Sequence, residues 1–185
     1  MLLLRGDKYW ELLRQKVSSS NLLYFPIFDI IKEDLVLFVP EEQNQKPKMA
    51  IIKDIIETAD RSMIVAGYMF YRPEEAELRN VRFEQPHGTR EVFYSFHRDE
   101  FPAESVMHKC VAHFISLNQQ IPPRIQYLGF IVQWVYNTRK RRLFELTHKH
   151  YSDNKRKEID LLIQKTKSRL EDPPVIESEY CATGQ

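Results

Sequence analysis

The chain has few of the residues from which cross-links, metal sites and phosphate-binding loops are built. It has two cysteines, Cys110 and Cys181, and they lie 71 positions apart in the 185 residues. This spacing gives neither a disulfide framework nor the paired pattern of a zinc site. The five glycines stand apart from one another, so no glycine-rich loop is present to hold a phosphate. The sequence therefore indicates no cofactor and no metal.

Signs of catalysis are also missing. The sequence has no Gly-x-Ser-x-Gly elbow and no His-Glu-x-x-His motif. The nearest approach to a metal cluster is His108, Cys110 and His113, but strand alternation places 113 on the opposite face from 108 and 110. We interpret Cys110 as a small buried residue and both histidines as partly exposed. His97 and Asp99 resemble an acid–base pair, yet no nucleophile accompanies them. We expect no enzyme.

No apolar run approaches the ~18 residues that a membrane-spanning helix needs, and the first four residues are too few for a signal peptide. We therefore expect a soluble, intracellular protein with no membrane partner. Net charge is only +1, but residues 139–170 hold eleven Lys or Arg and four acids. A basic segment on an otherwise acidic chain indicates contact with a polyanion, or a nuclear address. The alternative is a solvated basic face. The candidate patch is Arg139, Lys140, Arg141 and Arg142.

What the chain has in quantity is aromatic and β-branched residues, with 11 Phe and 9 Tyr. Such residues fit the half-buried surface of a sheet, so we predict a mainly β fold. Short runs between polar or proline-containing breaks predict strands at 35–39, 49–56, 63–71 and 91–96, and a hairpin with arms at 130–136 and 142–146. Apolar residues spaced by three and four predict a helix at about 154–170, with Asp153 as its N-cap.

These elements suggest one domain with additions. We predict an N-terminal appendage at 1–27, a β domain at 28–150, a C-terminal helix at 151–172 that packs on or extends it, and a frayed tail at 173–185.

Two short segments carry a resemblance to a known family. The first is Met69–Glu75 (MFYRPEE), in which an aromatic strand end runs into an Arg-Pro turn. The second is Glu91–Glu100 (EVFYSFHRDE), which presents a His and an Asp two positions apart. In this order, and with smaller pieces such as Val39–Glu42 and Ile51–Ile55, the chain from about Leu35 to Leu170 resembles bromo-adjacent homology (BAH) domains. It is most similar to the plant readers of methylated histone H3.

The resemblance implies a BAH-type twisted or barrel-like sheet with peripheral helices and a C-terminal helix. It also implies a peptide site. In the plant readers three aromatic residues surround a trimethyl-lysine, whose cation is attracted to ring faces. The matching cage positions here are Lys48, Met69 and Tyr71. A His and an Asp that contact the flanking peptide match His97 and Asp99.

Only Tyr71, His97 and Asp99 keep the identity that the readers have; Lys48 replaces a Tyr and Met69 replaces a Trp. The ammonium at 48 repels a ligand cation if it turns inward, and a thioether has no π face. Losing two rings, each contributing ~0.5–2 kcal/mol, weakens binding by tens-fold or more. For Tyr71 the competing interpretation is a packed core aromatic, and for Met69 it is core filler. For His97 and Asp99 it is a hydrogen-bonded turn.

Three hypotheses follow. The leading one is a non-catalytic nuclear chromatin module with a degraded aromatic cage, a subunit of a repressive complex whose partners are the histone H3 tail or nucleosome and other chromatin proteins. A second is an intact reader with a rearranged cage of Tyr68, Phe70 and Tyr94, which requires a β-bulge because 68 and 70 face away from 69 and 71. A third is weak, non-specific DNA binding through Arg139–Arg142 and a helix carrying Lys155, Arg156 and Lys157.

Overall fold

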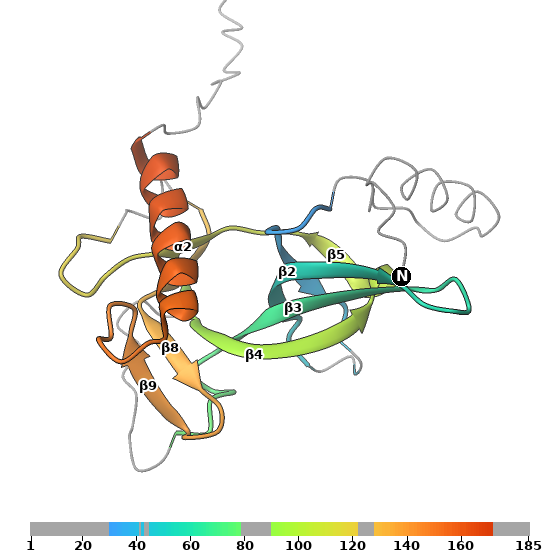
Figure 1. Cartoon of the computed structure of the whole chain (residues 1–185), viewed down its shortest axis with the longest axis horizontal. Coiled ribbons are helices and arrows are strands. Elements are labelled where there is room, and N and C mark those ends of the chain that lie inside the picture. The colour runs from blue at the N-terminus through green and yellow to red at the C-terminus, as the bar shows by residue number, and fades with distance from the viewer. Residues whose placement is uncertain (1–29, 41, 43–44, 79–89, 122–127, 172–185) are drawn as a thin grey trace, which may run out of the picture. The chain divides into compact units, whose positions relative to one another are not determined.

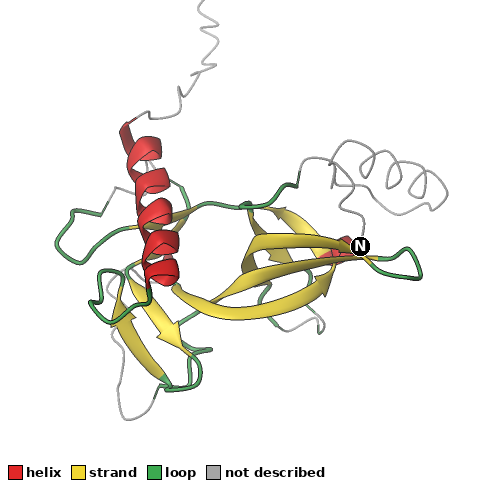
Figure 2. Cartoon of the chain, in the orientation of Figure 1, coloured by secondary structure: helices red, strands yellow, loops and turns green. Residues whose placement is uncertain are grey.

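The computed structural model describes residues 30–40, 42, 45–78, 90–121 and 128–171. They fall into two compact units. The first unit comprises the described residues up to Tyr71 together with Tyr94–Cys110, and the second comprises those of Arg72–Phe93 and those from Val111 onward. The segments predicted at 1–27 and 173–185 lie outside the described residues. The predicted mainly β class with a C-terminal helix is confirmed (Figure 2).

The described elements follow the chain in this order: β1 Leu35–Phe38, β2 Lys48–Glu57, β3 Met63–Tyr71, β4 Phe93–Pro102, the short 3-10 helix η3 Ala103–Ser105, β5 Val106–Lys109, β6 Ala112–Phe114, β7 Phe130–Val132, β8 Trp134–Asn137, β9 Arg142–Glu145 and α2 Asp153–Glu171. The strands predicted at 35–39, 49–56 and 63–71 are β1, β2 and β3. Within the described part, no helix is long and apolar enough to cross a bilayer.

The first unit is a twisted sheet in the order β5-β1-β2-β3-β4, in which β2, β3 and β4 are the long strands (Figure 1). β1 pairs antiparallel with both β2 and β5, and β2 pairs antiparallel with β3. Val39 follows β1, and its N–H donates to the Ser105 carbonyl at 2.7 Å. That hydrogen bond ties the end of β1 to the start of β5.

Side chains of β3 alternate between two faces of this sheet. Met63, Val65 and Met69 face a buried cluster, and Tyr71 packs against it. The other members of the cluster are Ile30, Val36, Phe38, Ala50, Ile52, Phe101, Ala103 and Val106, with Ile55 packed against them. Gly67 lies in β3 between Val65 and Met69. A Cβ at this position would lie 2.5 Å from the Ile51 carbonyl oxygen. Glycine at 67 therefore permits the close pairing of β2 and β3.

The fourth strand is longer than predicted. We expected it at 91–96, with His97 and Asp99 beyond its end; instead β4 runs to Pro102 and includes both residues. Past the predicted end, the side chain of Phe101 is buried again, at 9% exposure, whereas His97 on the same face is exposed. Glu91 is not part of β4 and forms an isolated bridge with Ile131 in the second unit.

In the second unit, the run 130–136 is not a single strand, contrary to prediction. Phe130–Val132 pairs in parallel with β6, whereas Trp134–Asn137 forms the antiparallel hairpin with β9. Gln133 separates the two pairings and is buried. Sequence periodicity cannot detect this division, because it depends on which strands become partners.

Helix α2 has the predicted position and face. Ile159, Leu162 and Thr166 are its buried residues. The Phe114 N–H donates to the Thr166 hydroxyl at 2.9 Å, and that hydroxyl donates to the Leu162 carbonyl at 3.0 Å, so the helix is joined to β6 by a buried hydrogen bond. Asp153 is the first helical residue rather than the N-cap. The first helical hydrogen bond runs from the Arg156 N–H to the carbonyl of Ser152, at 2.9 Å.

Candidate functional site

The residues that carry the predicted site all lie in the first unit. Tyr71 ends β3 and His97 lies in β4. The Tyr71 hydroxyl oxygen is 2.6 Å from His97 Nδ1, a hydrogen-bond distance, and their ring centroids are 6.2 Å apart with an interplanar angle of 31°. Tyr71 is half-buried and His97 is exposed. The structure therefore joins two of the predicted site residues by a direct contact.

Asp99 shares a strand with His97, and alternation directs both side chains to one face of β4. The Glu100 N–H donates to Asp99 Oδ1 at 2.9 Å. This hydrogen bond is local, as the competing interpretation of Asp99 requires, although it occurs in a strand rather than in a turn. Phe101 continues the same face, because it also lies two residues further on.

Met69 is a core residue of the first unit. It is 5% exposed and belongs to the buried cluster that includes Phe38 and Phe101. Ala50 is its partner across the β2–β3 pair. The thioether is therefore occupied in packing, and it offers no ring to a ligand.

Lys48 is exposed at the start of β2, opposite Phe38 of β1. Its ammonium nitrogen lies 5.5 Å from the centroid of the Phe101 ring, within the range of a cation–π contact. Phe101 in turn stacks on Phe38 with centroids 4.2 Å apart and an interplanar angle of 23°. Sequence reasoning did not identify Phe101 as part of the site. The signal available was its position two residues after Asp99, on the same side of an extended β4.

The aromatic residues proposed for a rearranged cage lie on the opposite face of the sheet. Tyr94 contacts Tyr68, Phe70 and Phe96 edge to face, with centroid separations of 6.3, 5.4 and 5.1 Å. β3 keeps its regular alternation, and the register shift in this pair lies in β2, between Ile52 and Asp54. These rings accordingly point away from Tyr71.

Charges on this second face are paired. Asp54 accepts from Lys32 Nζ at 2.6 Å and from Arg98 Nη2 at 3.0 Å. The hydrogen bond from Lys32 is the main cause that lowers the pKa of the Asp54 carboxyl, with a smaller contribution from Arg98. The Lys53 ammonium lies 5.5 Å from the Tyr68 ring centroid and 2.8 Å from Glu33 Oε1.

The residues considered for a metal cluster have different surroundings. In the first unit, burial raises the pKa of the Cys110 thiol to about 12, and Sγ donates to Met49 Sδ at 3.8 Å. His108 is exposed rather than partly exposed, and Cys110 is half-buried rather than buried as predicted. In the second unit, His113 is 3% exposed rather than partly exposed, and burial lowers its pKa. Its Nε2 lies 3.1 Å from the Leu128 carbonyl oxygen. Among the described residues, no three His, Cys, Asp or Glu side chains are grouped to hold a metal.

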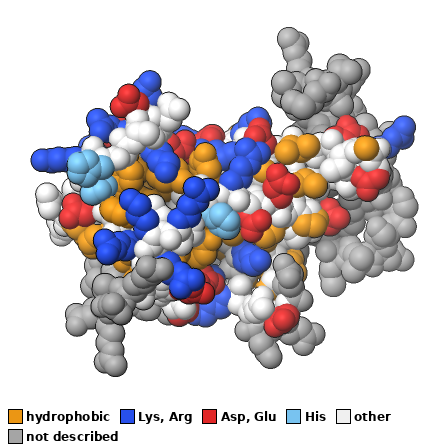
Figure 3. Space-filling view, turned by 60° about the horizontal axis from the view of Figure 1, so that its bottom comes forward, with side chains coloured by type: hydrophobic (Ala, Val, Ile, Leu, Met, Phe, Trp, Pro, Cys, Tyr) orange, Lys and Arg blue, Asp and Glu red, His pale blue; other side chains and the backbone are white. Residues whose placement is uncertain are grey.

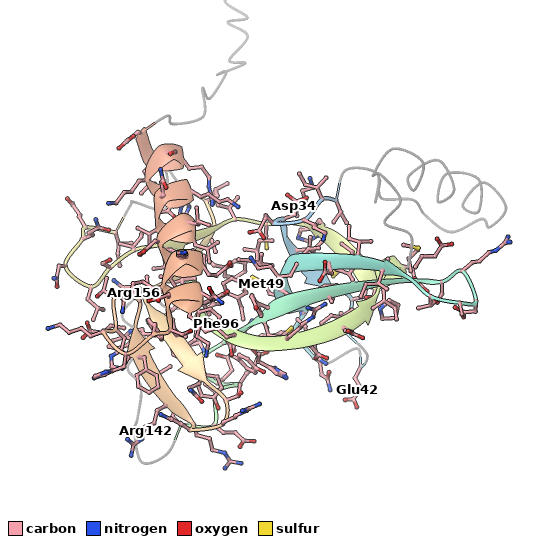
Figure 4. The ribbon with its side chains drawn as sticks, viewed as in Figure 1. Asp34, Glu42, Met49, Phe96, Arg142 and Arg156 are labelled. Carbon is pink, nitrogen blue, oxygen red and sulfur yellow. The ribbon has the colours of Figure 1, made fainter. Side chains whose placement is uncertain are left out.

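A separate basic surface lies in the second unit. Arg139, Lys140, Arg141 and Arg142 are all exposed at the β8–β9 connection. The Lys140 N–H donates to Asn137 Oδ1 at 2.9 Å, and the Lys140 ammonium lies 6.0 Å from the Phe144 ring centroid. Arg141 pairs with Glu77 at 3.1 Å. Figure 4 shows Arg142 projecting from this hairpin.

Ring and hydrogen-bond contacts connect that hairpin to the start of α2. The His148 ring centroid lies 4.7 Å from that of Phe144 and 5.5 Å from that of Tyr151. Arg156 Nη2 donates to the Lys149 carbonyl at 3.1 Å. These contacts run from the hairpin through the turn after β9 to the first turn of the helix, a stretch whose exposed cations include Lys149, Lys155 and Arg156. Residues 139–170 hold eleven Lys or Arg and four acids. In Figure 3, Lys and Arg side chains gather on the side of the molecule on which α2 and the hairpin lie.

The family model for the BAH domain matches residues 29–147, and the chain belongs to that family. The resemblance inferred from the sequence is thereby confirmed.

Individual relatives match parts of the chain. Chromatin remodeling protein EBS of Arabidopsis thaliana is 32% identical over 80 residues, which cover 43% of this chain and 33% of that protein. The crystal structure of the yeast Rsc2 BAH domain matches with a TM-score of 0.49 and 18% identity, over 63% of this chain and 49% of that one. The chain thus spans about a third of the length of the curated relative.

Proposed function

We propose that this chain is a non-catalytic chromatin-binding module that acts in the nucleus as an interaction or scaffold subunit in transcriptional repression. Its first unit binds an extended histone H3 tail with little dependence on lysine methylation. Membership of the BAH family and similarity to a protein named as a chromatin remodeling protein support the chromatin setting. The hydrogen bond between Tyr71 and His97 is the observation that carries the peptide site.

The positions of Tyr71, His97, Met69 and Lys48 favour binding of a peptide main chain over recognition of a methylated lysine. His97 is exposed on a strand and is held by Tyr71, so its imidazole has a fixed position from which to contact a passing main chain. Extended peptides commonly bind through backbone pairing with a sheet, and side chains then set the register. Met69 is buried, and Lys48 places a positive charge beside the site. A cationic methyl-lysine therefore gains little here.

Calorimetric titration with unmodified and trimethylated H3-tail peptides tests this proposal. We expect similar affinity for both peptides, and a loss of at least about tenfold in Tyr71→Ala and His97→Ala, since each removes an interaction of ~1.4 kcal/mol or more. Tyr71→Phe is the matched variant, because it keeps the ring and removes only the hydroxyl that meets His97.

A cage-restoring variant, Lys48→Tyr with Met69→Trp, runs beside the wild type after a thermal melt has established that it folds. It should gain a preference for the trimethylated peptide. Tight, mark-dependent binding by the wild type would contradict a degraded cage, and an absence of binding to any tail peptide would contradict the peptide site itself.

A second candidate function is contact with nucleosomal DNA through the basic surface of the second unit. The observation in its favour is an unbroken series of side-chain contacts. It runs from Lys140 through Phe144 and His148 to the first turn of α2. Cations at fixed positions along one surface match the phosphates of a duplex, and this kind of binding weakens steeply with salt. Phe144 and His148 are only partly exposed, which favours a phosphate surface over a base-stacking one.

Fluorescence anisotropy with a random-sequence DNA duplex, at several salt concentrations, tests the DNA surface. Arg139→Gln/Arg142→Gln should weaken binding and reduce the slope of log K against log salt by about 0.9 for each phosphate that is no longer neutralised. Lys165→Gln/Lys167→Gln, later in α2, removes the same charge and should have a smaller effect. Equal losses in the two variants would indicate general attraction rather than a defined surface. DNA binding that is unaffected by either pair would exclude this candidate.

A further inference from the structure

Lys48 contacts Phe101 on the face of the first unit to which Tyr71 also belongs. Lys48 faces the same side as Phe38, its partner across the β1–β2 pair. Phe38 stacks on Phe101, and both belong to the buried cluster against which Tyr71 packs. The Lys48 cation of β2, the Tyr71 ring of β3 and the Phe101 ring of β4 thus lie on the same face of the sheet.

The Phe101 ring has one face available to a cation. Its stacking on Phe38, at a centroid separation of 4.2 Å, leaves no space for an ammonium between the two rings. The Lys48 ammonium lies 5.5 Å from the Phe101 centroid and therefore uses the other face. The electron-rich face of an aromatic ring attracts lysine ammonium and quaternary ammonium groups alike.

We propose that Phe101 and Tyr71 form a binding surface for an ammonium side chain, and that Lys48 occupies this surface in cis. The proposal deepens the peptide site and rests on it for the identity of the natural ligand, a lysine or methylated lysine of a bound tail. Lys48 is then an internal competitor rather than only a lost cage residue.

Tethering makes the internal competitor effective. A group attached to the same folded sheet is present at an effective concentration of the order of millimolar or above, so a free ammonium ligand of weak intrinsic affinity does not displace it. Removing the Lys48 side chain exposes the ring face and also removes the charge that repels an incoming cation. Replacement by Arg keeps a cation that also stacks on rings, so it should leave the surface occupied.

The test uses the full chain and tetramethylammonium chloride as the probe, followed by NMR of the aromatic ring signals. Wild type and Lys48→Arg should show weak binding or none. Lys48→Ala should bind about tenfold more tightly, and Lys48→Ala/Phe101→Leu should return to the wild-type level. The proposal is overturned if Lys48→Ala gains nothing, or if its gain survives the loss of Phe101.

A measurement on the wild type alone keeps the test independent of whether the Phe101 variant folds. The ε-methylene protons of Lys48 should resonate upfield of those of the other lysines, because they lie over a ring. Resonance at the position of an unstructured lysine would also overturn the proposal.

Titrations with unmodified and trimethylated H3-tail peptides separate this proposal from the peptide site. If Lys48→Ala gains tetramethylammonium binding but no variant binds a tail, the ammonium surface stands and the tail-binding function fails. If tails bind and depend on His97, while Lys48→Ala changes neither probe, the tail-binding function stands and occupation in cis fails.

Discussion

At the scale of single residues, the environment decides which side chains can act. Lys48 and Cys110 show this in opposite ways. Lys48 is exposed, and its ammonium makes a cation–π contact with the Phe101 ring. From the sequence, this charge is expected only to repel a cationic ligand; in the structure it also has a specific contact. The Cys110 thiol is half-buried beside Met49, and burial raises its pKa to about 12.

This raised pKa makes Cys110 unreactive, because the thiolate is the nucleophile. In a Cys181→Ser variant at pH 8, we expect Ellman's reagent to react with Cys110 roughly 10³-fold more slowly than with an ordinary thiol of pKa ~8.5. The same sample in denaturant should react rapidly, which serves as the control. Equal rates in native and denatured protein would show that the thiol is not protected.

At the scale of elements, hydrogen bonds of Thr166 and Arg169 join α2 to β6, and the one at Thr166 is fully buried. The hydroxyl of Thr166 receives the N–H of Phe114 and donates within α2, so one side chain connects helix and strand. Thr166 is 1% exposed, and water is therefore not available to replace the hydroxyl if it is removed. An unsatisfied buried N–H typically costs about 1–3 kcal/mol.

Thr166→Val keeps the shape and removes the hydroxyl, so it should lower the free energy of unfolding by about 1–3 kcal/mol. Thr166→Ser keeps the hydroxyl and is the matched control, with a smaller expected loss. Urea denaturation followed by circular dichroism measures both. If the serine variant is no more stable than the valine variant, the hydrogen bond is not what joins α2 to β6.

Most elements could be predicted from the sequence, because local pattern and burial agree in them. The sequence of β3 predicts a strand, and the structure has a strand there. The spacing of Ile159 and Leu162 predicts the buried face of α2. What could not be predicted depends on partners distant in sequence. The division of 130–136 between two pairings and the contact of Lys48 with Phe101 are of this kind, since neither is encoded by neighbouring residues. The domain limits at 28–150 remain a prediction.

For the molecule as a whole, stability should depend on pH in two ranges. His113 is buried and its folded-state pKa lies below the ordinary value of 6.5, so the unfolded state binds more protons below that pH. Its contribution is complete above about pH 6.5 and is lost as the pH falls. Asp54 and Asp60 have pKa values lowered below 3.8, Asp60 to about 2 through hydrogen bonds from Thr58 and Ser62. Their contributions are lost only below about pH 4.

Thermal melts between pH 8 and pH 5 should therefore show a falling midpoint that His113→Gln flattens. His108→Gln, at an exposed position, is the control and should retain the wild-type slope. A variant whose slope is unchanged would show that another group, and not His113, controls stability in this range.

The two compact units are not consecutive along the chain. The backbone leaves the first unit after Tyr71, returns to it at Tyr94 and leaves again after Cys110. A truncation after Cys110 keeps both segments of the first unit but only the 72–93 segment of the second, whereas a cut within 72–93 divides both units. Progressive shortening from either end removes segments of the two units in alternation, so the end of a deletion does not by itself assign a lost activity to one unit. Point substitutions on the intact chain are therefore the appropriate way to assign a function to one unit.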